Sequence, residues 1–250
     1  MRDVIGSAVM RQRAARRWFG VAAAIMAACV PGCGAPATPQ GQSAAPAQLA
    51  AETFSTVAPR PVAPLPAAVV RSVTAAELGE TWRPGCPVEP QELRWLDLNF
   101  VDPDGTIRRG SLVVHRDVAD DVVEIFAELE RLRYPIAKMQ TVDRYRGAED
   151  ELSMRDNNTS AFNCRPLPGS SAWSKHAYGR AIDINPLVNP YITSGGDLEP
   201  ATAGDYLDRT RDVSGMLHAD SPAVRAFTDR GWRWGGAWRD PIDYQHFEIG

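Results

Sequence analysis

Between residues 118 and 132, apolar residues recur every three or four positions, while acids and arginines fill the positions between them. This spacing places the apolar side chains on one face of an α-helix. The apolar positions of the pattern are Val118, Val122, Ile125, Phe126, Leu129 and Leu132. We therefore expect an amphipathic helix that packs its apolar face on the core, with Asp117 as its cap and Pro135 as its stop.

A pair of strands is predicted before this helix. The apolar residues of 93–101 indicate the first strand and those of 111–115 the second. Between them, Asp102-Pro103-Asp104-Gly105 is a strong turn sequence. The two strands are therefore expected to form a hairpin.

Shorter elements follow the helix. Apolar runs predict strands at 136–142, 181–184 and 247–249, and Ser221-Pro222 begins a capped helix that ends near Gly231. Strands and helices in mixed order, with a hairpin at the start, are typical of an α+β fold. We expect a small antiparallel sheet with flanking helices, and we expect that sheet to carry the functional site.

The N-terminal segment has the composition of an export signal. Residues 2–17 contain five arginines and one aspartate, and the apolar stretch 18–30 that follows is too short to span a bilayer. Val30-Pro31-Gly32-Cys33 is similar to a bacterial lipoprotein cleavage site, where Cys33 would be acylated. An ordinary signal peptide is the alternative, and Arg16-Arg17 also permits twin-arginine export. We expect residues 1–33 to be a signal peptide, and the protein to be lipid-anchored at the outer face of the cell membrane or secreted to the cell wall.

Residues 34–75 are predicted to be a disordered Ala/Pro-rich linker, and residues 76–250 the folded domain. The linker contains few large apolar residues, so it cannot bury enough surface to offset the entropy lost on ordering. Removing residues 1–32, which carry a net charge of +4, changes the formal charge of the chain from −4 to −8. Such an acidic domain is a poor partner for nucleic acid.

Two cysteines remain after the export signal and the anchor. An exported protein with Cys86 and Cys164 left over most simply bonds them to each other. Two free buried thiols, or Cys164 as a metal ligand, are the competing interpretations.

Candidate chemistry begins with His176 and Asp183, which stand seven residues apart with Gly179 between them. That spacing permits a loop to turn back, so that the histidine and an aspartate at the start of a strand face one point. Asp183 lies within the apolar run 181–184, where a buried carboxylate is unfavourable unless a cation or strong donors compensate it. A zinc ion would provide that compensation, and a surface position for Asp183 is the alternative.

His246 completes a ligand set near the C-terminus. Two histidines and one carboxylate are common ligands of catalytic zinc, because they leave a fourth position for water or substrate. A lone histidine between Tyr244 and Phe247 would most often be structural, so the argument rests on the combination. Asp243 stands three residues earlier, where it can take a proton from water.

Together, Ser174-x-His176-x-x-Gly179-x-Ala181-x-Asp183 and the downstream Asp243-x-x-His246 resemble the motifs of the zinc-dependent D-alanyl-D-alanine carboxypeptidase family. That family includes vancomycin-resistance carboxypeptidases and the L-alanyl-D-glutamate peptidases of phage endolysins. The resemblance covers residues 80–250 or so. It implies a Hedgehog/D,D-peptidase-like fold.

The resemblance also implies roles for individual residues. The zinc ligands would be His176, Asp183 and His246, and Asp243 would be the catalytic base. The family uses an arginine upstream of the first ligand to hold substrate and to stabilise the oxyanion. Arg155 is the match, although the residues around it depart from the usual pattern, so Arg165 remains an alternative.

We therefore expect a zinc metallopeptidase that hydrolyses stem-peptide bonds of peptidoglycan, in the first place a D-alanyl-D-alanine carboxypeptidase. The alternatives are an L-alanyl-D-glutamate-type endopeptidase and a non-catalytic zinc-stabilised module that binds the cell wall, since the Hedgehog signalling domain has a similar zinc site. The presence of Asp243 favours catalysis.

Several neighbouring residues have structural interpretations as well. Ser174 could orient a ligand or cap a turn. The segment 232–238, Trp-Arg-Trp-Gly-Gly-Ala-Trp, could form one wall of a substrate cleft, although Trp232 or Trp234 is expected to lie mainly in the core. We expect His115 and His218 to be structural, because nothing near them completes a ligand set.

Overall fold

The computed structural model describes residues 66–167 and 169–250. The predictions of a signal peptide at 1–33, of acylation at Cys33 and of most of the linker therefore lie outside the described residues. Within the described ranges, no helix is long and apolar enough to cross a membrane.

Regular secondary structure is already present before the predicted domain boundary. Strand β1 (Val69–Ser72) lies inside the segment expected to be linker and pairs antiparallel with β2 (Leu93–Val101), from Val69 opposite Asp97 to Ser72 opposite Arg94. The linker prediction was thus wrong for these residues. Their backbone hydrogen bonds to β2 supply the stabilisation that their composition does not reveal.

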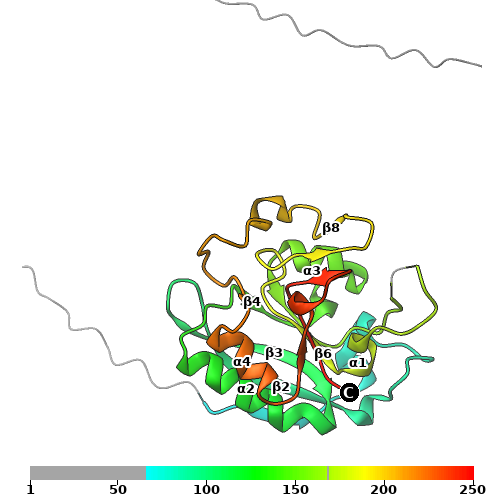
Figure 1. The fold of residues 1–250 in the computed structure, drawn as a ribbon. Helices are drawn as coiled ribbons and strands as arrows, with labels where there is room; N and C mark the ends of the chain where they lie inside the picture. Colours follow the sequence, from blue (N-terminus) through cyan, green and yellow to red (C-terminus); the bar gives the residue numbers. More distant parts are fainter. Residues whose placement is uncertain (1–65, 168) are drawn as a thin grey trace, which may run out of the picture. The chain divides into compact units, whose positions relative to one another are not determined.

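The predicted hairpin forms two of the three strands of the N-terminal sheet, which has the order β1-β2-β3. Its strands β2 and β3 are labelled in Figure 1. β3 (Ile107–His115) pairs with β2 along its whole length, from Leu93 opposite His115 to Val101 opposite Ile107. In the turn, the Asp102 carboxylate accepts hydrogen bonds from the backbone N–H groups of Asp104 and Thr106. The turn residues therefore fix the register of the hairpin.

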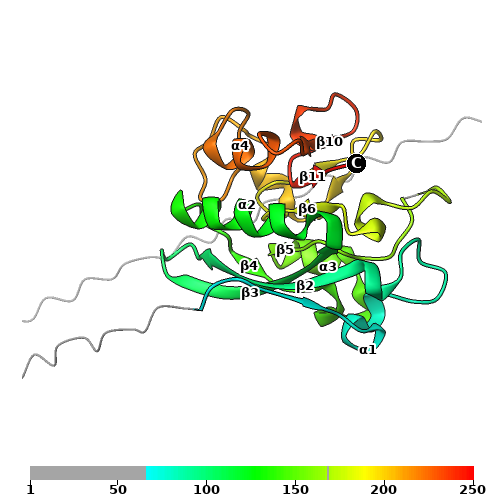
Figure 2. The ribbon, with the colours of Figure 1, turned by 90° about the horizontal axis from the view of Figure 1, so that it is seen from below.

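The amphipathic helix α2 (Ala119–Arg131) lies along one face of this sheet, between it and the C-terminal helix α4 (Pro222–Thr228) (Figure 2). The predicted apolar face is buried in the main core, except for Leu132, which follows the last residue of the helix and is only partly buried. Asp117, however, does not cap the helix. A 3₁₀ turn at Arg116–Val118 comes first, and the His115 side chain accepts the hydrogen bond from the Asp117 N–H instead.

A second antiparallel sheet, with the order β6-β11-β9, carries two of the predicted site residues. Its strands are β6 (Ala181–Asp183), β11 (His246–Glu248) and β9 (Arg233–Trp234). Phe247 stacks on Phe227 of α4 with ring centroids 3.9 Å apart, so the sheet is fixed to the main core through β11. Ser221 caps α4 by accepting a hydrogen bond from the Val224 N–H, as its sequence indicates.

The remaining elements are short. A third sheet has the order β10-β7-β8, formed by β10 (Ile242–Asp243), β7 (Tyr191–Ile192) and β8 (Leu198–Glu199). A parallel pair joins β4 (Lys138–Met139) to β5 (Asn158–Thr159), so the strand expected over 136–142 is much shorter than predicted. Helices α1 (Ala75–Leu78) and α3 (Asp150–Arg155) complete the set. The fold is α+β with small antiparallel sheets and few helices, as expected.

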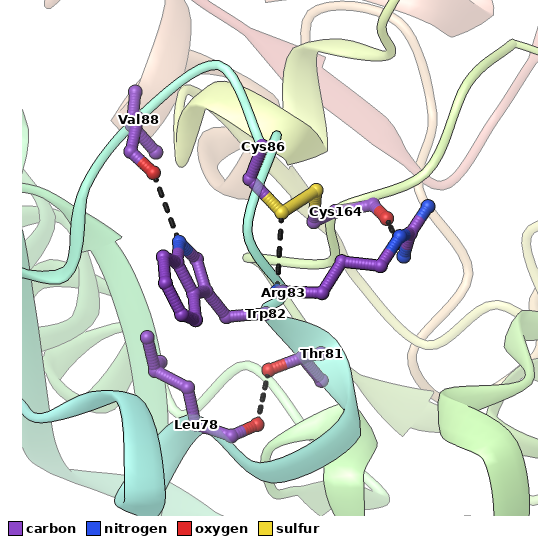
Figure 3. Close-up of a disulfide and its surroundings, with 7 residues drawn as sticks. All are labelled: Leu78, Thr81, Trp82, Arg83, Cys86, Val88 and Cys164. Carbon is purple, nitrogen blue, oxygen red and sulfur yellow. Dashed lines mark hydrogen bonds between the residues drawn. A yellow bond between two sulfur atoms is a disulfide. The ribbon is translucent and has the colours of Figure 1, made fainter.

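The predicted disulfide between Cys86 and Cys164 is present, with a Cα–Cα distance of 5.9 Å (Figure 3). Around it, Arg83 Nη1 donates to the Cys164 carbonyl at 2.8 Å, and Trp82 Nε1 donates to the Val88 carbonyl at 3.0 Å. Cys164 belongs to a second apolar cluster, against which Trp173 and Tyr178 pack. Since its sulfur is bonded to Cys86, Cys164 is not a metal ligand.

Candidate active site

The first site residue, His176, is positioned by a short 3₁₀ helix at Lys175–Tyr178. Ser174 caps this helix, because its Oγ accepts a hydrogen bond from the His176 N–H at 3.2 Å. Gly179 ends it with a φ of 65°, and a Cβ there would lie 2.6 Å from the His115 backbone nitrogen. Glycine is therefore required for the chain to turn from His176 into β6 against β3.

Asp183 and His246 are brought together by strand pairing. The two residues are direct partners in the register of β6 and β11. Asp183 is the last residue of β6, whereas the sequence analysis expected it at the start of a strand. The end of the strand serves the same purpose, since the carboxylate there faces both histidines.

The three side chains form one buried cluster. Asp183 Oδ1 lies 3.0 Å from His246 Nδ1, and Asp183 Oδ2 lies 3.1 Å from His176 Nε2. The two ring nitrogens are 3.2 Å from each other. One ligand atom from each residue therefore lies within 4.8 Å of the others, which is close enough for all three to hold one metal ion.

The hydrogen bonds behind the histidines fit such an ion. His176 Nδ1 lies 2.5 Å from the Ala161 carbonyl oxygen, and His246 Nε2 lies 3.3 Å from Glu248 Oε2. An oxygen acceptor at one ring nitrogen keeps the proton there, so the other nitrogen presents its lone pair. Both lone pairs then point at the Asp183 carboxylate and at each other. Two imidazole nitrogens and a carboxylate are a donor set that suits zinc.

The charges within the cluster shift its pKa values strongly. Burial raises the pKa of Asp183, but the charges and hydrogen bonds of His176 and His246 outweigh that effect and hold it well below its usual range. Burial lowers the pKa of His246, but hydrogen bonds to Asp183 and Glu248 outweigh it and raise the pKa to about 10. The cluster thus favours a positive charge between its members.

The expected base, Asp243, lies in the same cavity as the cluster. This cavity has a volume of about 540 Å³, and its lining includes His176, Asp183, His246 and Asp243. Burial, with the nearby charge of Asp183, raises the pKa of Asp243 to about 7, against the opposing effect of His246. A carboxyl group with such a pKa can both accept and return a proton near neutral pH.

The two candidate arginines have different positions. Arg155, at the end of α3, is exposed and is not among the residues that line the cavity. Arg165 lines the cavity, and its guanidinium forms an ion pair with Asp150. The structure therefore brings Arg165 to the cluster and leaves Arg155 outside.

The tryptophan-rich segment has a divided role. Trp232 and Trp234 are buried in the core, as expected, whereas Trp238 lines the cavity with its ring centroid 5.6 Å from that of His246. The paired glycines are required by packing within the protein. A Cβ on Gly235 would lie 2.7 Å from the Asp243 carbonyl oxygen, and a Cβ on Gly236 would collide with the Trp234 ring.

Of the two remaining histidines, His115 is buried and accepts the Asp117 N–H bond, which is a structural role. His218 is not among the residues of the metal cluster or of the cavity lining. Two further acids of the site were not predicted from the sequence. Glu248 contacts His246, and Asp150 forms the ion pair with Arg165. The position of Glu248 could have been predicted, because it stands two residues after His246 in the expected C-terminal strand and residues i and i+2 of a strand share a face.

Comparison with known proteins agrees with this geometry. A family model described as D-alanyl-D-alanine carboxypeptidase matches residues 168–249. The resemblance to that family is confirmed over these residues, which include neither Arg155 nor Arg165. The matched segment contains His176, Asp183, Asp243 and His246, and it ends beyond β11. No curated protein and no solved structure matches the chain. The family match and the buried cluster together support a metal-dependent peptidase.

Proposed function

We propose that the protein is a zinc peptidase that cleaves stem-peptide bonds of peptidoglycan, and specifically a D-alanyl-D-alanine carboxypeptidase. The observation that carries this proposal is that His176, Asp183 and His246 meet in one cavity that Asp243 also lines. In each histidine, the ring nitrogen that faces away from the cluster already has an oxygen acceptor. The family match supports the choice of reaction. The export signal and lipid anchor expected from residues 1–33 agree with a substrate outside the cell.

His176, Asp183 and His246 would hold the metal ion. A bound zinc ion lowers the pKa of a coordinated water and polarises a carbonyl group. The protein's own contribution is to keep both histidines in the correct tautomer and to keep Asp183 ionised.

Asp243 acts as the general base and then as the general acid. Its carboxylate takes a proton from the attacking water and later returns it to the leaving amine of D-alanine. A pKa near 7 suits both steps, because the group is easily protonated and deprotonated at the operating pH.

Arg165 is the substrate arginine in this proposal, in place of Arg155. Its guanidinium lines the cavity that holds the cluster and is anchored on one side by Asp150. Asp150 is itself fixed, because its Oδ1 accepts a 2.7 Å hydrogen bond from Asn163 Nδ2. A guanidinium held in this way can bind the terminal carboxylate of a peptide through two parallel hydrogen bonds.

The deciding experiment uses a synthetic stem pentapeptide that ends in D-Ala-D-Ala. The zinc-loaded protein should release free D-alanine, and a chelator should stop the reaction until zinc is restored. Mass spectrometry of the products distinguishes loss of the terminal residue from cleavage inside the peptide. Internal cleavage would replace the carboxypeptidase with the endopeptidase alternative. A zinc-loaded protein that binds peptidoglycan without cutting it would refute the enzymatic proposal.

A further inference from the structure

Glu248 lines the cavity and contacts His246 at the ring nitrogen that does not face Asp183. It stands two residues after His246 on β11, so strand alternation places both side chains on one face. Its Oε2 lies 3.3 Å from His246 Nε2, and its side chain is only 12% exposed. Glu248 therefore occupies the position of an acceptor for the ring nitrogen that faces away from the cluster.

A second contact fixes the orientation of Glu248. Arg233 is its direct partner in the register of β9 and β11, and Arg233 Nη2 lies 2.5 Å from Glu248 Oε1. One carboxylate oxygen thus bonds the arginine, and the other bonds the histidine. With both oxygens engaged, the carboxylate cannot rotate without losing a charged hydrogen bond.

The two histidines are held in the same way by different groups. His176 Nδ1 faces the backbone carbonyl of Ala161, which no side-chain substitution removes. His246 Nε2 faces the side chain of Glu248, which a substitution does remove. Without that acceptor, the His246 proton could occupy either nitrogen, and the ring could turn away from Asp183.

We propose that Glu248, held by Arg233, is a positioning residue that fixes the tautomer and orientation of His246 for metal binding. This inference rests on the proposed metal site. It adds that the affinity of the site depends on the cross-strand pair of β9 and β11 and not on the three ligands alone. Acceptors behind metal-bound histidines generally contribute about 10- to 100-fold to metal affinity.

The test measures zinc affinity by competition with a chromophoric chelator, without any substrate. Glu248→Ala should weaken zinc binding by about 10- to 100-fold. Glu248→Gln should weaken it less, because the amide oxygen can still accept the His246 proton. Arg233→Ala should also weaken it less, since the acceptor remains but is no longer clamped.

Asp102→Asn is the matched control. Asp102 forms an ion pair with Arg108 and has a side-chain exposure of 10%, close to that of Glu248, but it lies in the hairpin turn of β2 and β3. This variant should lose stability with no change in zinc affinity.

A spectroscopic measurement separates positioning from general stability. In the zinc-loaded wild type, the Nε2–H proton of His246 should give a slowly exchanging NMR signal, because Glu248 accepts it. Glu248→Ala should broaden or remove this signal, and Asp102→Asn should leave it unchanged.

The outcomes are distinguishable. A folded Glu248→Ala variant with wild-type zinc affinity overturns the role of Glu248 and leaves the proposed function intact. If that variant does not fold, unchanged affinity in both Glu248→Gln and Arg233→Ala overturns it equally. A wild-type protein that does not bind zinc overturns the metal site, and with it both proposals.

Discussion

His176 and His246 are 70 residues apart in the chain, yet His176 Nε2 lies 3.2 Å from His246 Nδ1. Each ring has its other nitrogen against an oxygen acceptor, so the two facing nitrogens both present lone pairs. Two lone pairs repel at this distance unless a proton or a metal ion lies between them. The negative charge of Asp183, whose oxygens lie beside both nitrogens, further favours a cation at this position.

This relationship predicts that zinc stabilises the protein more as the pH rises. Without metal, the positive charge is a proton on His246, whose pKa is raised to about 10. A raised pKa gives stability that is complete below the unfolded value of about 6.5 and is lost as the pH rises through about 10. Zinc supplies the charge without that proton. The increase in melting temperature on zinc addition should therefore be larger at pH 9 than at pH 6.5.

Thermal unfolding with zinc or with chelator, across that pH range, checks this expectation. A His246→Ala variant should show little increase at either pH, because it lacks both the raised pKa and the ligand. An increase that is equal at pH 6.5 and pH 9 in the wild type would contradict the electrostatic account.

Asp243→Asn should separate catalysis from metal binding. Loss of a positioned general base costs about 10²- to 10⁴-fold in rate. Zinc affinity should change little, since Asp243 is not one of the three clustered ligands. The measurements are pentapeptide turnover and chelator competition. Asp240→Asn, which changes an exposed acid three residues earlier, is the control and should retain both properties. Equal loss of zinc in both Asp243→Asn and His176→Ala would mean that the roles are misassigned.

The same carboxyl group should set the acidic limb of the pH–rate profile. Activity should rise as Asp243 loses its proton. Without metal, burial raises the pKa of Asp243 to about 7. A nearby cation lowers the pKa of a carboxyl group, so the apparent pKa of Asp243 in the zinc enzyme should lie below 7. Stopped-time assays of kcat/KM against pH measure it. Activity that did not rise with pH below 7 would contradict a base role.

Long elements and motif residues could be predicted from the sequence because their signals are local. The hairpin and α2 each show many periods of their apolar pattern, and the observed bounds of the first strand, Leu93–Val101, equal the predicted ones. Strands of two residues, such as β7 and β10, show no full period. They exist because their neighbours offer backbone partners, which is information that one segment of sequence does not contain.

The choice between the two candidate arginines could not be made from sequence for the same reason. Arg155 and Arg165 are both upstream of His176, and their neighbours in sequence do not tell which one reaches the cavity. The disulfide of Cys164 and the carboxylate of Asp150 place Arg165, and both contacts are tertiary. By contrast, His176 and Asp183 could be paired from sequence, because a single turn at Gly179 connects them.

Arg165→Ala should reduce kcat/KM for the pentapeptide by about 10- to 100-fold, the usual value of a hydrogen-bonded charged contact. The loss should be much smaller for a substrate with an amidated C-terminus, which has no carboxylate to bind. Arg165→Lys should recover only part of the activity, because an ammonium group cannot form two parallel bonds. Arg155→Ala is the exposed control and should behave as wild type. A larger effect at Arg155 than at Arg165 would restore the original assignment.

The disulfide should contribute strongly to stability, because the linked cysteines are 78 residues apart. Closing a loop of this length stabilises a protein by about 4.5 kcal/mol in the chain-entropy model. A Cys86→Ser/Cys164→Ser variant should show a correspondingly lower free energy of unfolding in denaturant titrations. Since Arg165 follows Cys164 directly, the variant should also show a raised KM. Wild-type stability under reducing conditions would contradict the prediction.

Gly235→Ala should impair catalysis although it removes no functional group. The added Cβ would lie 2.7 Å from the Asp243 carbonyl oxygen and 2.9 Å from its Cβ, so the base has to move. A displacement of the base lowers kcat because proton transfer requires hydrogen-bond geometry, whereas zinc affinity should be nearly unchanged. Gly204→Ala is the matched control, since a Cβ there meets nothing within 4 Å. A wild-type rate of pentapeptide turnover in Gly235→Ala would contradict the claim that catalysis depends on the position of Asp243.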